Sequence, residues 1–239
     1  MSKDSESARR SVIVTGGARG IGASIAARFA AAGDDVTVAD LVKPASDGVG
    51  VRYVETDVAV ETSVSSLVKS VLHQTGRVDV LVNNAGIWFA RPFTEITSEE
   101  WDKVINVNLR GTYLCTQSVI GPMSGSGGGS IINIGSQAGV AVTRGQGAHY
   151  HASKAAISHL TTMLAFELGP CGIRINTVAP GATPTQPSVF PSKLLDQIPL
   201  GRAGRGEDIA AMAYFLSTEE SAFVTGQTIL VNGGAVAFL

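Results

Sequence analysis

The chain has 239 residues, of which 18 are Lys or Arg and 20 are Asp or Glu, so its formal net charge is -2 with histidine neutral. This near balance excludes a strongly basic nucleic-acid binder, and the 44% of apolar residues excludes a charged, disordered chain. No apolar run approaches the roughly 18 residues of a membrane span, and the polar start is unlike a secretory signal. We therefore expect a cytoplasmic protein that binds neither nucleic acid nor membrane.

No Pro- or Ser-rich linker divides the chain, and an α/β chain of up to about 250 residues can close around a single core. We expect residues 1–10 to form a flexible N-terminal segment and residues 11–239 to form a single domain. Cys115 and Cys171 lack the C-x-x-C spacing of a metal or redox site. Both are expected to be reduced, mostly buried thiols without a chemical role.

Short β-rich runs alternate with longer stretches of helical period along the chain. Strands that are apolar nearly throughout are typical of parallel sheets, because helices cover both faces of such sheets. The alternation predicts an α/β fold, a doubly wound parallel sheet of seven strands with helices on both faces. The expected strands are Ser11 to Thr15, Asp35 to Ala39, Val51 to Glu55, Val80 to Asn83, Ser130 to Ile134, Ile173 to Val178 and Thr228 to Val231.

Capping residues and glycines indicate where the helices begin and end. Thr97 and Glu100 form a possible capping box for a helix that continues through Asn108. The glycine-containing segments Lys43 to Gly50 and Gly121 to Gly129 are expected to be loops. The other expected helices are Ile21 to Ala32, Thr62 to Gln74, about 150 to 169, and Glu207 to Leu216.

A glycine-rich turn joins the first expected strand to the first expected helix. Gly16, Gly20 and Gly22 allow a sharp turn and a close approach of the backbone to a pyrophosphate, with Arg19 and Ile21 between them. The positive end of the following helix stabilises the charge of such a group. By itself the loop is equally compatible with an ordinary strand-to-helix turn, but its position favours a dinucleotide site.

Asp40 follows the second expected strand, 24 residues beyond Gly16. A carboxylate there can accept hydrogen bonds from both hydroxyls of the adenosine ribose, and it would repel the 2′-phosphate of NADP. Arg19 could pair with that phosphate, but Asp40 would lie nearer, and Leu41 and Val42 add no second cation. We expect NAD as the cofactor, with NADP as the less favoured alternative.

Tyr150 and Lys154 lie four residues apart in a helical stretch, so the phenol and the ammonium share a face. An isolated tyrosine has a pKa near ~10, and a nearby ammonium or a positive nicotinamide ring favours the phenolate. Lowering that pKa by about two to three units takes roughly 3 to 4 kcal/mol, which two cations in a dry site could supply. The pair alone is also a common surface pattern, so the general-base interpretation depends on further motifs.

Four further polar motifs, three at the ends of strands and one inside a helix, are expected to converge at the edge where an open parallel sheet binds ligands. They are Asn83-Asn84-Ala85-Gly86, Asn106-Val107-Asn108, Gly135-Ser136 and Asn176-Thr177-Val178-Ala179-Pro180-Gly181. With the glycine loop and the Tyr150 and Lys154 pair, these motifs resemble, in order, those of the short-chain dehydrogenase/reductase (SDR) family, in its NAD- or NADP-dependent single-domain branch. The resemblance covers the chain from about Ser11 to Gly234.

The resemblance implies a Rossmann fold and a catalytic set. Tyr150 would take or give the hydroxyl proton, Lys154 would lower the pKa of that tyrosine and bind the nicotinamide ribose, and Ser136 would hold the substrate oxygen. Asn108 would anchor a water that links Lys154 to solvent, and no metal is required. The family is usually tetrameric, so we expect a homotetramer, and the apolar residues Ala235 to Leu239 suggest a C-terminus packed against a partner subunit.

For the cofactor, the resemblance places Asp57 and Val58 on the adenine side and Asn84 beside the adenosine ribose. Thr183 and Thr185 would face the nicotinamide amide. The remaining expected cofactor-binding residues are Gly16, Arg19, Gly20, Ile21, Gly22, Asp40, Gly86, Tyr150, Lys154, Pro180 and Gly181.

Two features depart from the family pattern. Ser136 and Tyr150 are one residue further apart than is most common, so the segment Gln137 to His149 is expected to be reshaped, which affects substrate choice. Pro184 is unusual between the two threonines and would stiffen the start of a short flap, Gln186 to Gln197.

Histidines and aromatic residues near the motifs admit more than one interpretation. His149, His151 and His159 do not share a helical face, so no metal site is expected, and His149 is expected to line the pocket mouth. Trp88 and Phe89 either form an aromatic wall for the substrate or pack between helices.

The arginines outside the motifs also admit more than one interpretation. Arg91 and Arg144 either bind a substrate carboxylate or, as is more frequent, are solvated surface cations. Arg202 is expected to be structural.

Three functions are compatible with these motifs. The leading one is an NAD-dependent dehydrogenase that interconverts a secondary alcohol or cis-diol, such as a sugar, hydroxysteroid or dihydrodiol, and its ketone. The second is a 3-oxoacyl-carrier-protein reductase, which Ile198 to Gly206 also resembles. Asp40 disfavours the NADPH that such reductases mostly use, and Ser130 and Cys171 stand where they carry basic residues for the acidic carrier. The third is a silent dinucleotide-binding sensor, which the intact catalytic set disfavours.

Overall fold

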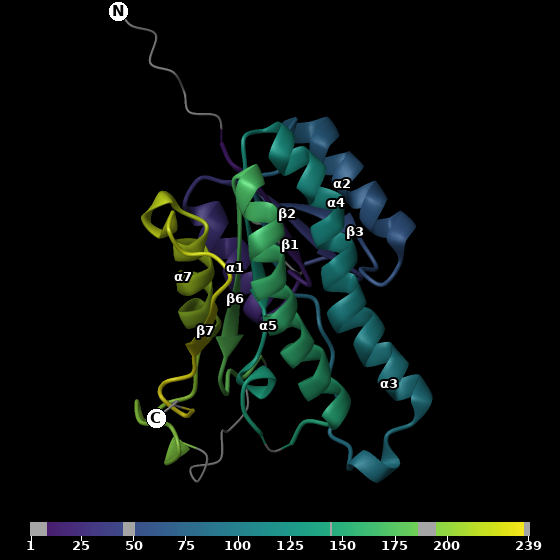
Figure 1. The fold of residues 1–239 in the computed structure, drawn as a ribbon, viewed down its shortest axis with the longest axis vertical. Helices are drawn as coiled ribbons and strands as arrows, with labels where there is room; N and C mark the ends of the chain where they lie inside the picture. The colour runs from purple at the N-terminus through teal and green to yellow at the C-terminus, as the bar shows by residue number, and fades with distance from the viewer. Residues whose placement is uncertain (1–8, 45–50, 144, 186–194, 237–239) are drawn as a thin grey trace, which may run out of the picture.

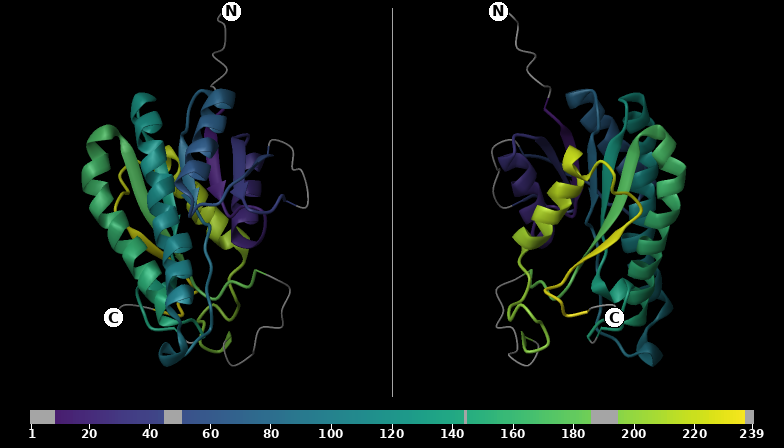
Figure 2. Two further views of the ribbon diagram at one scale, coloured as in Figure 1. Left: turned by 90° about the vertical axis from the view of Figure 1, so that its right-hand side faces the viewer. Right: turned by 60° about the vertical axis from the view of Figure 1, so that its left-hand side comes forward.

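The structure is a computed structural model that describes residues 9–44, 51–143, 145–185 and 195–236. Its centre is a parallel sheet of seven strands in the order β3-β2-β1-β4-β5-β6-β7. The strand order reverses between β1 and β4, and helices lie on both faces of the sheet (Figures 1 and 2). This doubly wound arrangement confirms the predicted fold class. The strands are β1 (Ser11–Thr15), β2 (Asp35–Asp40), β3 (Val51–Glu55), β4 (Val80–Asn83), β5 (Gly129–Ile134), β6 (Ile173–Pro180) and β7 (Thr228–Val231).

All seven predicted strands are present, and three extend beyond their predicted bounds. β2 continues to Asp40, β5 begins at Gly129 and β6 continues to Pro180. Each added residue has an in-register partner on a neighbouring strand, so the parallel ladder itself extends the strand. The extension of β2 carries the Asp40 side chain to the carboxyl edge of the sheet.

The predicted helices lie close to observed ones, and their ends follow the predicted signals, but α4 (Gly111–Gly125) was not predicted. α2 ends at Gly76, whose φ of 74° is the left-handed conformation that glycine adopts at helix ends. The long α5 ends in a short 3-10 turn before β6. The α-helices are α1 (Gly20–Ala31), α2 (Glu61–Thr75), α3 (Ser98–Ile105), α4 (Gly111–Gly125), α5 (Ala148–Leu168) and α7 (Gly206–Leu216).

Two apolar layers form the core, one on each face of the sheet. Alternate residues of a strand face opposite sides, and β1 follows this rule: Val12 and Val14 pack against α1 and α7, whereas Ile13 packs against α2 and α4. The fully buried Phe29 of α1 and Leu67 of α2 lie in the two layers. The sheet is therefore buried on both faces, which explains its nearly continuous apolar strands.

The predicted loop Gly121 to Gly129 is wrong for its first half. α4 continues through Gly125 with Pro122 inside it, because the buried Met123 anchors the last turn against the sheet. The chain turns only at Gly127 and Gly128, whose φ angles are 92° and 124°. A glycine-rich sequence therefore conceals one helical turn that tertiary packing stabilises.

The helix predicted from Thr97 through Asn108 is divided in two. The Thr97 side chain caps α3 by accepting from the Glu100 amide at 3.2 Å, as predicted. The Glu100 carboxylate, however, accepts from Arg91 Nε at 3.1 Å. α3 ends at Ile105 and continues as a π-helical turn, Asn106–Arg110, which leads into α4.

Arg10 is firmly placed, although the sequence analysis includes it in a flexible segment. Its guanidinium binds Asp34 with two hydrogen bonds of 2.9 and 2.7 Å and also donates to the Ser217 carbonyl at 2.9 Å. Residues 1–8 lie outside the described ranges, as do Arg144, residues 237–239 and most of the predicted segments at 43–50 and 186–197.

The two cysteines differ in environment. Cys115 is buried in α4, and burial raises the pKa of its thiol to about 12. Cys171 is exposed, so the prediction of a mostly buried thiol is wrong there. Among the helices of the described ranges, none is long and apolar enough to span a bilayer.

Candidate active site

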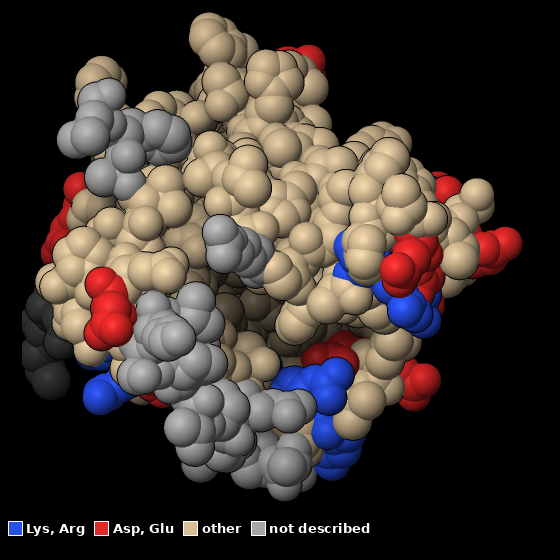
Figure 3. Space-filling model, turned by 90° about the horizontal axis from the view of Figure 1, so that it is seen from below, with Lys and Arg blue, Asp and Glu red and all other residues tan. Residues whose placement is uncertain are grey.

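The predicted catalytic residues converge at the carboxyl edge of the sheet. Ser136 follows β5, Tyr150 and Lys154 lie in the first turns of α5, and Asn108 lies in the π-helical turn. β6 and β7 point downward in Figure 1, so this edge is the lower one there. Figure 3 views the molecule from that side, where the surface is hollowed near its centre and Lys and Arg side chains gather at one side of the hollow.

The Ser136 hydroxyl and the Tyr150 phenol face one another. Ser136 is 8% exposed, and its hydroxyl also accepts from the Ala138 amide at 3.1 Å. Burial raises the pKa of the Tyr150 phenol above its ordinary value, and the hydrogen bond with Ser136 counteracts that rise. The two hydroxyl groups can therefore share one substrate oxygen.

Lys154 lies within the same cluster, with its ammonium over the ring of Tyr150. Its Nζ donates to the Ile134 carbonyl at 2.8 Å and lies 5.7 Å from the centre of the Tyr150 ring. Burial lowers the pKa of Lys154 to about 8. In the chain without a cofactor, desolvation of the phenol dominates and raises the pKa of Tyr150, so its lowering by Lys154 and a bound nicotinamide stays a prediction.

Asn108 is completely buried and fixes the chain that follows β4. Its Oδ1 accepts from the Ile87 amide at 2.8 Å, and its Nδ2 donates to the Ile87 carbonyl at 2.9 Å and to Ser153 Oγ at 3.1 Å. A Cβ on Gly86 would lie 3.4 Å from the Asn108 Oδ1 and 3.6 Å from the Lys154 Nζ. Gly86 therefore lets the backbone pass beside both polar side chains.

The glycine loop is closed by a side chain from the neighbouring strand. Asn84, which follows β4, donates to the carbonyl oxygens of Thr15 and Gly16 at 3.0 and 2.8 Å. Gly16 has a φ of 62°, and a Cβ on Gly22 would overlap the Gly16 carbonyl oxygen. These positions need glycine because the loop folds back on itself at the start of α1.

Asp40 lies beside this loop. Its Oδ2 accepts from the Ala18 amide at 3.0 Å, and its Oδ1 accepts from the Val42 amide at 3.2 Å. Arg19 is exposed and precedes α1. The structure thus brings the Asp40 carboxylate to the backbone of the glycine loop, and the cofactor-binding roles of Asp40 and Arg19 stay predictions.

A cavity of about 470 Å³ opens at the start of α1, lined in part by Gly20, Ile21 and Thr185. A Cβ on Gly20 would lie 3.0 Å from Thr185, so the loop and the segment after β6 are in close contact. Thr183 donates to the Gly181 carbonyl at 3.2 Å. These positions agree with a pyrophosphate at the helix start and a nicotinamide below β6.

The remaining predicted cofactor residues are placed by backbone contacts. Asp57 Oδ1 accepts from the Ala59 amide at 2.9 Å, and Val58 is buried where a Cβ on Gly111 would lie 2.8 Å from its Cγ2. Pro180 ends β6, and the amide of Gly181 donates to the Val231 carbonyl at 3.0 Å. These contacts hold the loops at the sheet edge where a dinucleotide would lie.

The geometry fits a nicotinamide dinucleotide. Glycines stand where a side chain would collide, residues at the start of α1 line a cavity, and a carboxylate ends β2. These are the elements with which an open parallel sheet holds a pyrophosphate and an adenosine ribose.

His149 does not line a pocket mouth, contrary to the prediction. Its side chain is completely buried, and its ring packs against Trp101 and Phe89. His151 lies within hydrogen-bond distance of Thr143, and His159 is exposed. In the described part of the chain, no group of three or more His, Cys, Asp or Glu side chains could hold a metal ion.

Phe89 packs against another ring, as one of the two alternatives for Trp88 and Phe89 expects: its ring centre lies 6.0 Å from that of His149. Trp88 is 55% exposed, and its role as a wall for the substrate stays a prediction. Arg91 is half-exposed and ion-paired with Glu100. Arg202 pairs with Asp208 through bonds of 2.7 and 2.9 Å, and this pairing lowers the pKa of Asp208 to about 2.

Sequence reasoning missed two hydroxyl groups that support the site. Ser153 Oγ donates to the Tyr150 carbonyl at 2.8 Å and accepts from Asn108, and Thr15 Oγ1 accepts from the Asn84 amide at 3.0 Å. Only their places in the sequence could have indicated these two residues. Ser153 lies between Tyr150 and Lys154, and Thr15 ends the strand before the glycine loop.

Comparisons with known proteins agree with this geometry. A family model described as enoyl-(acyl carrier protein) reductase matches residues 16–236. A (2S)-[(R)-hydroxy(phenyl)methyl]succinyl-CoA dehydrogenase subunit, BbsD, of Thauera aromatica is 38% identical over 96% of this chain and 97% of its own. The 3-oxoacyl-[acyl-carrier-protein] reductase FabG of Staphylococcus aureus is also 38% identical, over 94% of this chain and 97% of its own.

Solved structures agree as well. The ligand-free aldohexose dehydrogenase AldT of Thermoplasma acidophilum is 30% identical, superposes with a TM-score of 0.89, and matches 95% of this chain and 94% of its own. The glycine loop, the polar cluster at the sheet edge and these similarities lead to one assignment. The chain belongs to the short-chain dehydrogenase/reductase family of NAD(P)-dependent oxidoreductases.

Proposed function

We propose that the protein is an NAD-preferring dehydrogenase that interconverts a secondary alcohol or cis-diol and its ketone, with Tyr150 as general acid and base. The observation that carries this proposal is the convergence of Tyr150, Ser136 and Lys154 at the carboxyl edge of the sheet, beside the glycine loop. A bound nicotinamide would supply the hydride acceptor or donor.

In this proposal the residues of the chain position the substrate and move its proton. The Ser136 hydroxyl donates a hydrogen bond to the substrate oxygen, which stabilises negative charge on that oxygen. The Tyr150 phenolate accepts the proton of the alcohol during oxidation, and the phenol returns it to the carbonyl oxygen during reduction. Lys154, held by the Ile134 carbonyl, adds positive charge close to the phenol. Asn108, which bonds both backbone groups of Ile87, would anchor a water that links Lys154 to solvent.

The preference for NAD is proposed from Asp40. Its carboxylate stands at the end of β2 beside the Ala18 amide, where a second negative charge from a 2′-phosphate would be repelled. The same residues would bind the rest of either dinucleotide: the glycine loop at the pyrophosphate, Asp57 and Val58 at the adenine, and Thr183 and Thr185 at the nicotinamide. The family's usual homotetramer is proposed for this chain as well.

A 3-oxoacyl-carrier-protein reductase is the second candidate, because relatives 38% identical over nearly the whole chain bear that name. The absence of a basic residue at position 130 does not exclude this candidate. Ser130 is 3% exposed and donates to the Leu216 carbonyl, so its lack of charge says little about a carrier-binding surface. Asp40 remains the residue that separates the two candidates, through its expected effect on NADPH.

A substrate panel tests the proposal. Secondary alcohols, cis-diols, aldohexoses, 3-oxoacyl thioesters and enoyl thioesters are incubated with the reduced or oxidised form of each cofactor, and reduced nicotinamide is followed by absorbance. The proposal predicts oxidation of an alcohol, diol or sugar with NAD. Turnover of 3-oxoacyl thioesters alone, with NADPH, would favour the second candidate, and binding without turnover would favour a silent sensor.

A further inference from the structure

His149 precedes Tyr150 and contacts its backbone directly. α5 begins at Ala148, and its N-cap is Gly147, which has no side chain to cap the first turn. The first amides of a helix have no acceptor within the helix. Here the Tyr150 amide donates both to the Gly147 carbonyl at 3.1 Å and to the Nδ1 of His149 at 2.9 Å. The imidazole thus supplies a second acceptor, from a side chain, for this amide of the first turn.

This bond determines the tautomer of the ring. A nitrogen that accepts from an amide carries no proton, so the proton of the neutral imidazole lies on Nε2. Nε2 is buried and has no hydrogen-bond partner among the residues that the structure describes. A buried donor without a partner destabilises the fold, and such groups call for a functional explanation. A phenylalanine ring would fill the same space without that cost.

Three neighbours hold the ring in place. The Trp101 ring of α3 stacks on it with centres 6.5 Å apart and an interplanar angle of 28°, and the Phe89 ring lies 6.0 Å away. A Cβ on Gly147 would overlap the imidazole, and the Gly147 amide donates to the Phe89 carbonyl at 2.9 Å. The start of α5, the segment after β4 and α3 therefore meet at one buried side chain.

We propose that His149 is a positioning residue, which acts in its Nε2-protonated form to fix the backbone of Tyr150 and thereby aim the phenol at Ser136. Helix ends otherwise fray, and a displacement of about 1 Å in a reacting group can lower a rate about 100-fold. The inference rests on the proposed role of Tyr150 as general acid and base.

Two substitutions separate the acceptor from the ring. In His149→Asn the Oδ1 takes the covalent position of Nδ1 and can accept from Tyr150, although the ring is lost. His149→Phe keeps the ring but has no acceptor. We expect H149F to lower kcat about 30-fold or more with KM for cofactor nearly unchanged and thermal stability equal or higher. H149N should recover most of kcat despite lower stability.

Amide exchange of Tyr150, followed by mass spectrometry or NMR, provides a readout that needs no substrate. The amide should exchange faster in H149F than in the native protein and in H149N. His159→Asn, on the exposed side of the same helix, is the matched control for both measurements. If H149F does not fold, His149→Gln replaces it, because its amide lies one atom too far along the chain to accept from Tyr150.

The possible results are distinct. Unchanged kcat and unchanged exchange in H149F, or an H149N variant as impaired as H149F, would overturn the positioning role. A stability loss in H149F that accounts for all of its lost activity would also overturn it. If the native protein turns over no substrate of the panel, the proposed function fails, and the exchange rates alone then decide the proposal on His149.

Discussion

The Lys154 ammonium donates to the Ile134 carbonyl at 2.8 Å, although Tyr150 stands one turn away on the same helix. The i, i+4 spacing places both side chains on one face but does not determine where the ammonium points. The carbonyl at the end of β5 holds the charge beside the phenol ring, 5.7 Å from its centre. The strand and the helix together therefore set the electrostatics of the pair.

The buried lysine makes stability depend on pH. Burial lowers the pKa of Lys154 from about 10.5 to about 8, so between these values the unfolded chain binds a proton that the folded chain does not. The free energy of unfolding should consequently rise with pH across this window, by about 3 kcal/mol relative to Lys154→Met. Urea unfolding of both proteins from pH 7 to 10.5 measures the difference. A constant difference would show that Lys154 is not desolvated as described.

Asp40→Asn tests the cofactor preference. The amide keeps the size and one acceptor of the carboxylate but removes the charge that repels a 2′-phosphate. We expect kcat/KM for NADP to rise relative to that for NAD by about tenfold or more. Asp35→Asn, at the other end of β2, is the control and should leave the ratio unchanged. The same ratio in D40N and the native protein would exclude Asp40 as the selective residue.

Asn108→Ala removes the side chain that bonds both backbone groups of Ile87. Buried polar groups without partners destabilise a fold, so the free energy of unfolding should fall by about 3 kcal/mol. The kcat should fall because Ser153, which donates to the Tyr150 carbonyl, loses its bond with Asn108. Asn106→Ala, at an exposed position of the same π-helical turn, should change both quantities little. Equal effects of the two substitutions would contradict the role of Asn108.

Local pattern predicts much of this molecule, and long-range contacts decide the rest. The strands could be located because burial on both faces requires apolar runs, and the glycine loop because its tight turn excludes side chains. The π-helical turn could not be located from the sequence, because Asn108 within it bonds to Ile87, which lies 21 residues away. The burial of His149 could likewise not be predicted from the sequence, because its neighbours Phe89 and Trp101 belong to other segments of the chain.

The loop prediction for Gly121 to Gly129 failed for a related reason. Glycine and serine disfavour helix as isolated residues, but the fully buried Met123 ties the last turn of α4 to the sheet. The orientation of Lys154 also depends on a long-range contact, because the Ile134 carbonyl that binds it lies 20 residues earlier in the chain. Sequence spacing thus predicted which residues share a helix face but not the partners that they bind.

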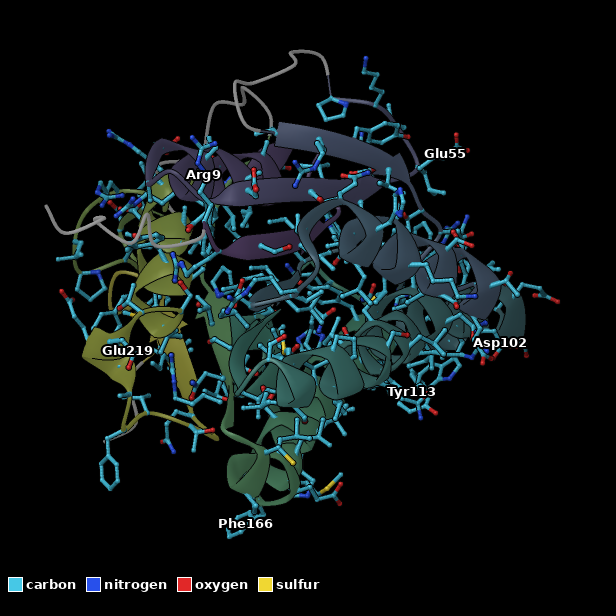
Figure 4. The ribbon with its side chains drawn as sticks, turned by 90° about the horizontal axis from the view of Figure 1, so that it is seen from above. Arg9, Glu55, Asp102, Tyr113, Phe166 and Glu219 are labelled. Carbon is cyan, nitrogen blue, oxygen red and sulfur yellow. The ribbon has the colours of Figure 1, made fainter. Side chains whose placement is uncertain are left out.

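Tyr150→Phe directly tests the central claim, which is the proposed acid-base role of Tyr150. Tyr113→Phe is the matched control, because Tyr113 points outward from α4, as Phe166 does from α5 (Figure 4). For an alcohol that the native protein oxidises, kcat of Y150F should fall about 1,000-fold, while the dissociation constant of NADH changes less than about threefold and Y113F remains fully active. Turnover by Y150F within about tenfold of the native rate, with NADH bound normally, would contradict the central claim.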